Sequence, residues 1–228
     1  MSALVRRLCA VLLLLVALPA QAVPARDWSR IATRLPSGEF VQGNPAAKVK
    51  LVEMLSLTCP HCAHFAAEGS APLVANYIRS GRVSYEVRVA VRDPLDLTAA
   101  VLARCGGPRF FFGVLPAVFA AQANWIGAGE AWMQTSPNLS GMGAGQIAQA
   151  FAAGSGLDSL FAAHGLARQR IAACLADSAD ARLVATHAAA IWKQPDFPGT
   201  PAFLINGVAA ANVREWPSLD AKLAAALR

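Results

Sequence analysis

The chain carries little charge and no dense cluster of one sign. Only 15% of its 228 residues are Asp, Glu, Lys or Arg, and the net charge is +6 at pH 7. No long Lys/Arg run appears in the sequence. Nucleic-acid-binding domains instead gather basic residues on one face or along one helix. We therefore expect no nucleic-acid partner.

The chain also lacks an apolar run long enough to cross a membrane. The run Leu8–Leu18 has 11 residues, whereas a membrane-spanning helix needs about 20. Two arginines precede this run and Ala20-Gln21-Ala22 follows it, a pattern typical of a cleaved secretory signal peptide. We predict that residues 1–22 are removed and that the mature chain begins at Val23. An uncleaved anchor is the alternative.

Cysteine is sparse, with five residues in the whole chain. Cys9 lies within the predicted signal peptide, so the mature chain keeps four. Export, which we expect to be to the periplasm, places these thiols in an oxidising compartment where disulfides persist. Two of them stand in Cys59-Pro60-His61-Cys62.

This motif follows a strand-like run, Val49–Leu57, and opens a helix-like run that extends to about Arg79. The first N–H groups of a helix lack intrahelical acceptors, and the helix dipole is positive there. A thiolate at Cys59 is stabilised at such a position, and Pro60 suits the first helical turn because it has no N–H to leave unpaired. We predict that Cys59 is the nucleophile and that Cys62 is the resolving thiol.

Metal and haem sites are the other uses of closely spaced cysteines. His64 completes a Cys-x-x-Cys-x-His pattern, but c-type haem attachment needs His directly after the second cysteine, where Ala63 stands. A zinc site needs four ligands, and no second Cys/His cluster is apparent in the sequence. We expect neither a metal nor a cofactor, and we interpret His64 as an ordinary helix residue.

The order of predicted elements defines the architecture. Val83–Val91 alternates apolar and polar residues, as a strand does, so the chain begins with strand, helix and strand. Asn206-Gly207 between two short apolar runs is a strong two-residue hairpin signal, and a closing helix is expected from Trp216. Between these parts we predict a glycine-rich loop over 126–143 and helices over 95–105, 108–124, 144–154, 157–163, 168–176 and 178–193.

This order, with the cysteine pair at the first strand-to-helix junction, resembles the α/β thioredoxin fold with an inserted all-helical subdomain. More narrowly, the chain resembles the DsbA-like family of exported thiol-disulfide oxidoreductases. The motif Cys59–Cys62, the position of the insertion and Gly199-Thr200-Pro201 carry this resemblance. We expect the following division of the mature chain: a loosely ordered leader over 23–39, the sheet domain over 40–93, the helical insertion over 94–194 and the rest of the sheet domain over 195–228.

The resemblance implies roles for residues around the cysteines. His61 is expected to stabilise the Cys59 thiolate by charge or hydrogen bonding, the alternative being a solvent-facing residue with no electrostatic role. Glu53, six residues before Cys59, corresponds to a buried glutamate that moves protons or tunes the thiols, the alternative being a solvent-facing carboxylate. Pro201 is expected to be cis and to face the cysteine pair. Thr200 pairs through its backbone with an extended substrate segment.

Cys105 and Cys174 both fall within the predicted insertion. The favoured interpretation is one non-catalytic disulfide that ties two helices together. Two buried free thiols are one alternative, and a pair that shuttles electrons with Cys59 and Cys62 is another.

The leading functional hypothesis is a monomeric dithiol oxidase that donates the Cys59–Cys62 disulfide to reduced, newly exported proteins. The resemblance implies re-oxidation by a quinone-linked membrane oxidase of the DsbB type. A disulfide isomerase or reductase, kept reduced by a partner, is the second hypothesis, and Thr200 keeps it open. The third is a thiol-based metal-binding or chaperone module without redox turnover.

Overall fold

The computed structural model describes residues 26–228. The predicted signal peptide, Cys9 and the start of the mature chain at Val23 therefore lie outside the described residues. Within 26–228 the strands form one sheet in the order β1-β2-β4-β3-β5-β6. The strands are β1 (Ala32–Arg34), β2 (Phe40–Gly43), β3 (Val49–Leu55), β4 (Val83–Val89), β5 (Ala202–Ile205) and β6 (Val208–Ala209).

A parallel strand pair forms the centre of the sheet. β3 and β4 are parallel, with Glu53 opposite Val87, and every other strand pair is antiparallel. Helix α1 (Pro60–Leu73) connects them and continues as a π-helical turn, η2 (Val74–Ile78). This change follows Pro72, which cannot donate a backbone hydrogen bond inside the helix. The predicted strand–helix–strand unit is confirmed.

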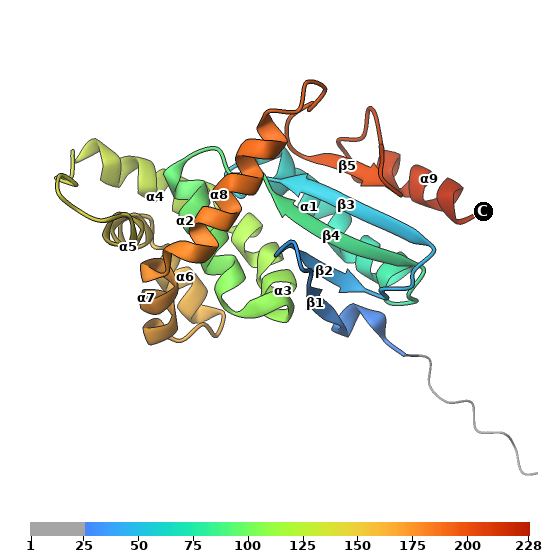
Figure 1. Cartoon of the computed structure of the whole chain (residues 1–228), viewed down its shortest axis with the longest axis horizontal. Helices are drawn as coiled ribbons and strands as arrows, with labels where there is room; N and C mark the ends of the chain where they lie inside the picture. The colour runs from blue at the N-terminus through green and yellow to red at the C-terminus, as the bar shows by residue number, and fades with distance from the viewer. Residues whose placement is uncertain (1–25) are drawn as a thin grey trace, which may run out of the picture.

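The helices between β4 and β5 gather at one end of the sheet, and α3 and α8 also contact its strands (Figure 1). They are α2 (Pro94–Cys105), α3 (Gly107–Ala120), α4 (Gln122–Gln134), α5 (Ala144–Ser155), α6 (Leu157–Ala163), α7 (Arg168–Ala176) and α8 (Ser178–Trp192). Their bounds agree closely with the predicted helices, apart from the region of α3 and α4. No single helix in the described part of the chain is long and apolar enough to cross a membrane, although α3 and α4, bent by 73°, reach that length and composition as a pair.

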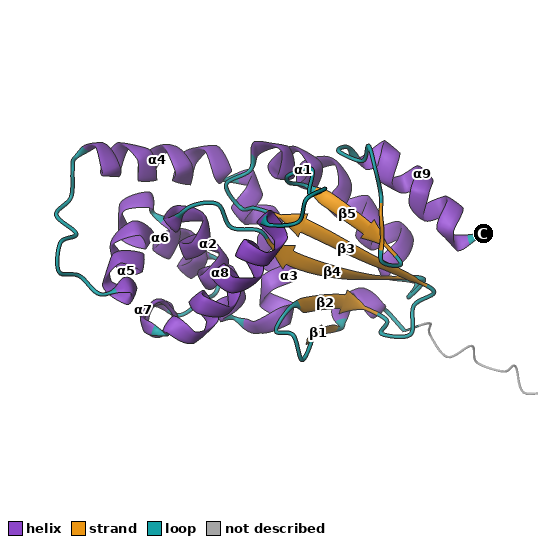
Figure 2. Cartoon of the chain, turned by 45° about the horizontal axis from the view of Figure 1, so that its top comes forward, coloured by secondary structure: helices purple, strands orange, loops and turns teal. Residues whose placement is uncertain are grey.

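Helices cover both faces of the sheet at β3, a central strand. Val49 and Leu51 pack in one cluster with Phe65 of α1 and with Leu219 of α9 (Trp216–Leu227). Met54, on the opposite face, packs with Ile191 of α8. Figure 2 shows the strands as a twisted layer with helices around it. The predicted α/β thioredoxin fold with an all-helical insertion is confirmed.

The hairpin between β5 and β6 has the predicted two-residue turn. Asn206 and Gly207 have φ values of 51° and 82°, and Ile205 pairs with Val208. Positive φ at both central residues is what a type I′ turn requires, and Asn-Gly accepts it at low cost. Thr200 and Pro201 directly precede β5, at the other end of the strand from this turn.

Two predictions about irregular segments are wrong. The supposed loose leader contains a 3-10 turn, η1 (Trp28–Arg30), and strand β1, which pairs with β2. The predicted loop over 126–143 is helical as far as Gln134. Trp125 is buried, and Trp132 packs edge-on against Phe151 with ring centroids 5.2 Å apart. Tertiary packing of this kind offsets the low helix propensity of the glycines in α4.

Candidate active site

Cys59 stands at the junction between β3 and α1. It is the N-cap residue of α1 with extended backbone angles, and Pro60 occupies the first turn. Cys59 is 3% exposed and Cys62 is fully buried, whereas Pro60 and His61 face solvent. Both cysteines are free thiols in this structure. The motif therefore presents one sulfur close to the surface and keeps the other beneath it.

The two thiols differ strongly in acidity. A hydrogen bond from the Cys62 thiol lowers the pKa of Cys59 to about 5, and Thr200 and the backbone N–H groups of Cys62 and His61 act in the same direction, while burial opposes them. The pKa of Cys62 is raised, first by burial and then by its hydrogen bond to Cys59. Cys59 is thus the thiolate at neutral pH and Cys62 remains protonated, as the predicted roles of nucleophile and resolving thiol require.

The loop before β5 faces Cys59. The peptide bond between Thr200 and Pro201 is cis, and both residues are buried. The Cys59 Sγ lies 3.2 Å from the carbonyl oxygen of Thr200, 141 residues away in sequence, and donates to it as a thiol. The structure therefore brings both predicted substrate-binding residues to the cysteine pair.

Glu53 lies in the core, behind the cysteines. Its side chain is 2% exposed, and the hydroxyl of Tyr85, on β4, donates a hydrogen bond to its carboxylate. Burial raises the pKa of Glu53 to about 7, the Tyr85 hydrogen bond lowers it, and charge at Cys59 raises it. A charged Glu53 in turn contributes to the raised pKa of Cys62. The protonation of Glu53 is therefore coupled to that of both thiols, and the alternative of a solvent-facing carboxylate is wrong.

Tyr85 was not among the predicted site residues. Its place in the alternating pattern of β4 indicates a strand residue and says nothing about which neighbouring strand its hydroxyl reaches. Burial, followed by the charge of Glu53, raises the pKa of Tyr85 well above its ordinary value. Tyr85 therefore remains a hydrogen-bond donor to Glu53 throughout the neutral range.

Asp96 holds the loop between β3 and α1 and was also not predicted. Its carboxylate is fully buried and accepts hydrogen bonds from Ser56 Oγ at 2.6 Å, from the Leu57 N–H at 2.9 Å and from the Arg92 N–H at 3.0 Å. Burial raises the pKa of Asp96 to about 6. The only sequence signal is an acidic residue in the first turn after Asp93-Pro94, which usually indicates a helix start alone.

Gln122 supports the same loop from the insertion. Its Nε2 donates to the carbonyl oxygens of Leu57, at 2.7 Å, and of Cys59, at 3.0 Å. The side chain is 7% exposed. The Leu57 carbonyl depends on the bond from Gln122, because a buried carbonyl without a partner is destabilising. The Cys59 carbonyl also accepts the N–H groups of Cys62 and Ala63.

Of the two histidines near the motif, only His61 affects the acidity of Cys59. The His61 side chain faces solvent, and its backbone N–H helps to lower the pKa of Cys59. His64 is exposed and lies 3.3 Å from Glu68, one helical turn along α1, as expected for an ordinary helix residue. Within residues 26–228, no group of three or more His, Cys, Asp or Glu side chains is arranged to hold a metal ion.

Cys105 and Cys174 form a disulfide between the end of α2 and α7, with a Cα–Cα distance of 5.9 Å. They pair with each other and not with Cys59 or Cys62, which are both free thiols. The disulfide therefore belongs to the helical subdomain, and the redox motif stands apart from it.

Comparison with known proteins gives the family. A family model described as thioredoxin matches residues 36–225, most of the chain. The chain belongs to the thioredoxin family. It is 35% identical to a protein-disulfide isomerase from Novosphingobium aromaticivorans, with a TM-score of 0.74, and the match covers 82% of this chain and 96% of that one.

DsbA-like proteins share its fold. The alpha-DsbA1 protein of Wolbachia pipientis is 22% identical, with a TM-score of 0.62 and coverage of 85% of this chain and 92% of that one. A Rickettsia conorii protein named a protein-disulfide oxidoreductase is 26% identical over 189 residues, 83% of this chain and 61% of the relative. The chain thus spans about three fifths of the length of that relative. In fold, the chain is similar to DsbA-like proteins.

Proposed function

We propose that this chain is a thiol-disulfide oxidoreductase that donates its Cys59–Cys62 disulfide to reduced proteins. The observation that carries the proposal is the contrast between the two thiols: the pKa of Cys59 is lowered to about 5 and that of Cys62 is raised. Stabilising the Cys59 thiolate favours the reduced protein, so the oxidised protein takes up electrons readily. This contrast supports donation of the disulfide as the direction of exchange.

The reaction proceeds through a mixed disulfide at Cys59. A substrate thiolate attacks the Cys59 sulfur of the oxidised protein, the bond between Cys59 and Cys62 breaks, and Cys62 leaves and takes a proton. Glu53, protonated near neutral pH because its pKa is about 7, is the proposed source of that proton. A second substrate thiolate then attacks the substrate sulfur of the mixed disulfide. Cys59 leaves as a thiolate, and two electrons have passed from the substrate to the protein.

The substrate segment is proposed to lie along the loop before β5. The Thr200 backbone stands beside Cys59, where an extended chain gains backbone hydrogen bonds in the manner of strand addition. Reduced, unfolded secreted proteins satisfy this requirement because their cysteines lie in extended segments. Re-oxidation of Cys59 and Cys62 requires an electron acceptor, for which we propose a quinone-linked membrane oxidase of the DsbB type.

We also propose that the protein acts as a monomer in the periplasm. The support for export is the sequence of residues 1–22, with two arginines, a short apolar run and a small-x-small site. N-terminal sequencing of the protein from a periplasmic extract is expected to start at Val23. A first residue before Ala20 in the extracted protein contradicts cleavage.

A disulfide isomerase is the second candidate. Two observations favour it: the relative at 35% identity is named a protein-disulfide isomerase, and Thr200 is a polar residue beside Cys59. The redox state in cells separates the candidates. Rapid acid quenching followed by thiol alkylation traps a mostly oxidised motif for an oxidase and a mostly reduced one for an isomerase.

The activity itself is tested with reduced, denatured ribonuclease A. One equivalent of the oxidised protein is expected to introduce about one disulfide in a rapid burst, and Cys59→Ser is expected to abolish it. The double variant Cys105→Ala/Cys174→Ala is the matched control, because it removes two cysteines and leaves the motif intact. Oxidation by Cys59→Ser at the rate of the unaltered protein contradicts the proposal.

A further inference from the structure

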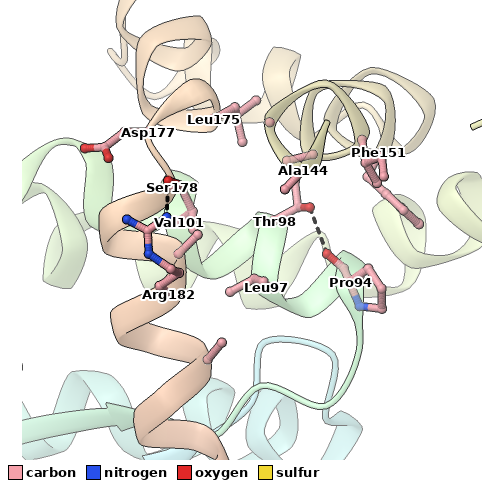
Figure 3. A pocket seen from close by; sticks show the side chains of 15 residues that line it. Pro94, Leu97, Thr98, Val101, Ala144, Phe151, Leu175, Asp177, Ser178 and Arg182 are labelled. Carbon is pink, nitrogen blue, oxygen red and sulfur yellow. Dashed lines mark hydrogen bonds between the residues drawn. The ribbon is translucent and has the colours of Figure 1, made fainter. Parts of the chain in front are cut away.

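A cavity of about 430 Å³ lies inside the helical subdomain, and no residue of the redox motif lines it. Helices α2, α5, α7 and α8 line it, and it is open to solvent on one side (Figure 3). Small-molecule sites in proteins occupy about 300–1,000 Å³ and are mostly apolar with a few polar groups that fix orientation. The cavity therefore has the size of a ligand site and stands apart from the chemistry of Cys59 and Cys62.

The wall of the cavity is apolar. Its side chains include Leu97 and Val101 from α2, Phe151 from α5 and Leu175 from α7. The hydroxyl of Thr98 is the polar group on α2, and it donates to the Pro94 carbonyl at 2.8 Å, so it is already satisfied. The wall offers contact area and no free hydrogen-bonding group, which suits an aliphatic body.

The polar residues stand together at the start of α8. Arg182 lines the cavity, and its guanidinium donates one hydrogen bond to Ser178 Oγ. Asp177 is the one acidic side chain in the lining, and its carboxylate accepts the Ala179 N–H at 2.8 Å as the cap of α8. Among residues 26–228, Arg182 forms no salt bridge. Arg182 is exposed, so a guanidinium with donors accessible to a ligand from solvent stands at the edge of the apolar cavity.

We propose that this cavity binds an aliphatic carboxylate, with its chain against Leu97, Val101 and Phe151 and its carboxylate on Arg182. The guanidinium fork matches a carboxylate in a two-bond geometry. A neutral amphiphile gains no charge-assisted hydrogen bond from the guanidinium, and a cationic amphiphile is repelled by it. The class of ligand therefore follows from one cation at the edge of an apolar wall.

The first test is calorimetric titration of the whole mature protein with hexanoate, octanoate and decanoate below their micellar concentrations. Each methylene buried in an apolar site is expected to increase affinity about fourfold until the cavity is full. The same titration with octylamine is expected to show weaker binding than octanoate. No binding of decanoate, or tighter binding of octylamine, overturns the proposal.

The second test separates the role of the charge from that of the wall. Arg182→Gln is expected to weaken octanoate binding about tenfold, as loss of a charged hydrogen bond does, and to leave 1-octanol binding unchanged. An equal effect on both ligands, or an effect on neither, contradicts a carboxylate on Arg182.

The third test fills the cavity at its edge. Ala185, exposed on α8, lines the cavity, whereas Ala189, one turn further along and also exposed, does not. Ala185→Trp is expected to abolish octanoate binding, and Ala189→Trp, the matched control, to retain it. Both variants are expected to keep the unfolding midpoint and the ribonuclease oxidation burst of the unaltered protein. Retained octanoate binding in Ala185→Trp overturns the proposal. The proposal also fails if the unaltered protein sediments as a dimer and Ala185→Trp sediments as a monomer, because a second copy of the chain then occupies the cavity.

Discussion

Gln122 and Cys59 are joined by a hydrogen bond of 3.0 Å from the Gln122 Nε2 to the Cys59 carbonyl oxygen, across 63 residues of sequence. Gln122 begins α4 in the insertion, whereas Cys59 caps α1 in the sheet domain. Asp96, in the first turn of α2, binds Leu57 in the same loop. The inserted helices therefore fix the backbone of the redox motif from two directions.

Replacing Gln122 is expected to loosen this connection. Gln122→Leu leaves the Leu57 carbonyl buried without a donor, whereas the Cys59 carbonyl keeps the N–H groups of Cys62 and Ala63. The free energy of unfolding should therefore fall by about 1–3 kcal/mol. Urea unfolding measures the change. Asn124→Leu, at an exposed position of the same helix, is the matched control and should have little effect. Equal stability of Gln122→Leu and the unaltered protein contradicts the assigned role.

The Cys59 thiolate is expected to control reactivity above pH 5. The rate of iodoacetamide alkylation of the reduced protein should rise with a midpoint near pH 5, because the pKa of Cys59 is about 5. Since this pKa is depressed in the folded state, the thiolate stabilises the reduced protein at neutral pH, and that stability is lost as pH falls through 5. The thiolate contributes about 3 kcal/mol to the stability of the reduced protein at pH 7, because pH 7 lies about two units above the pKa of Cys59. Cys59→Ser should lack it, and an alkylation midpoint near pH 8.5 contradicts the assignment.

Glu53 is expected to make the protein less stable as pH rises. Burial raises its pKa to about 7, so the folded state holds a proton that the unfolded chain releases near pH 4.5. Below pH 4.5 the carboxyl is protonated in both the folded and the unfolded state. As pH rises from 4.5 to 7, the free energy of unfolding falls by up to about 3 kcal/mol, because only the unfolded chain releases the proton readily.

Glu53→Gln tests this pH dependence in urea unfolding measured across that range. The variant should lack the slope and should exceed the unaltered protein in stability at pH 7.5, while both should be similar at pH 4.5. Glu68→Gln, at an exposed position of α1, is the control. An unchanged slope in Glu53→Gln places the titrating group elsewhere.

Removing the Cys105–Cys174 disulfide should affect stability and not the redox motif. It closes a loop of 69 residues, which corresponds to about 4 kcal/mol of loop-closure entropy, an upper figure for the loss. Cys105→Ala/Cys174→Ala should unfold at lower urea and still oxidise reduced ribonuclease A with the same burst. A weaker burst at full folding indicates that the second pair exchanges electrons with Cys59 and Cys62.

The sequence predicts much of this molecule because its strongest patterns are local. The alternation of Val83–Val89, the Asn206-Gly207 turn and the proline at the start of α1 each specify their own conformation. The Cys59–Cys62 motif with its strand-to-helix context predicts the nucleophile, and the resemblance it carries points to Glu53 and Thr200. The structure brings all of these together.

The unpredicted parts depend on contacts between distant segments. Strand β1 is short and has no clear alternation, and contacts with β2 and with the inserted helices fix it. Helix α4 continues through Gly127 and Gly129 because Trp132 packs on Phe151. Gln122 and Tyr85 look like ordinary helix and strand residues, and their roles follow from partners on other elements.

The reduction potential of the Cys59–Cys62 pair tests the central claim most directly. The folded protein is equilibrated in glutathione buffers at pH 7, and the fractions of reduced and oxidised motif are trapped by alkylation and counted by mass. A stabilised Cys59 thiolate predicts a reduction potential of about −120 mV, that of a strong dithiol oxidant. A value near −270 mV, that of a reductant, contradicts the proposal that this protein donates its disulfide.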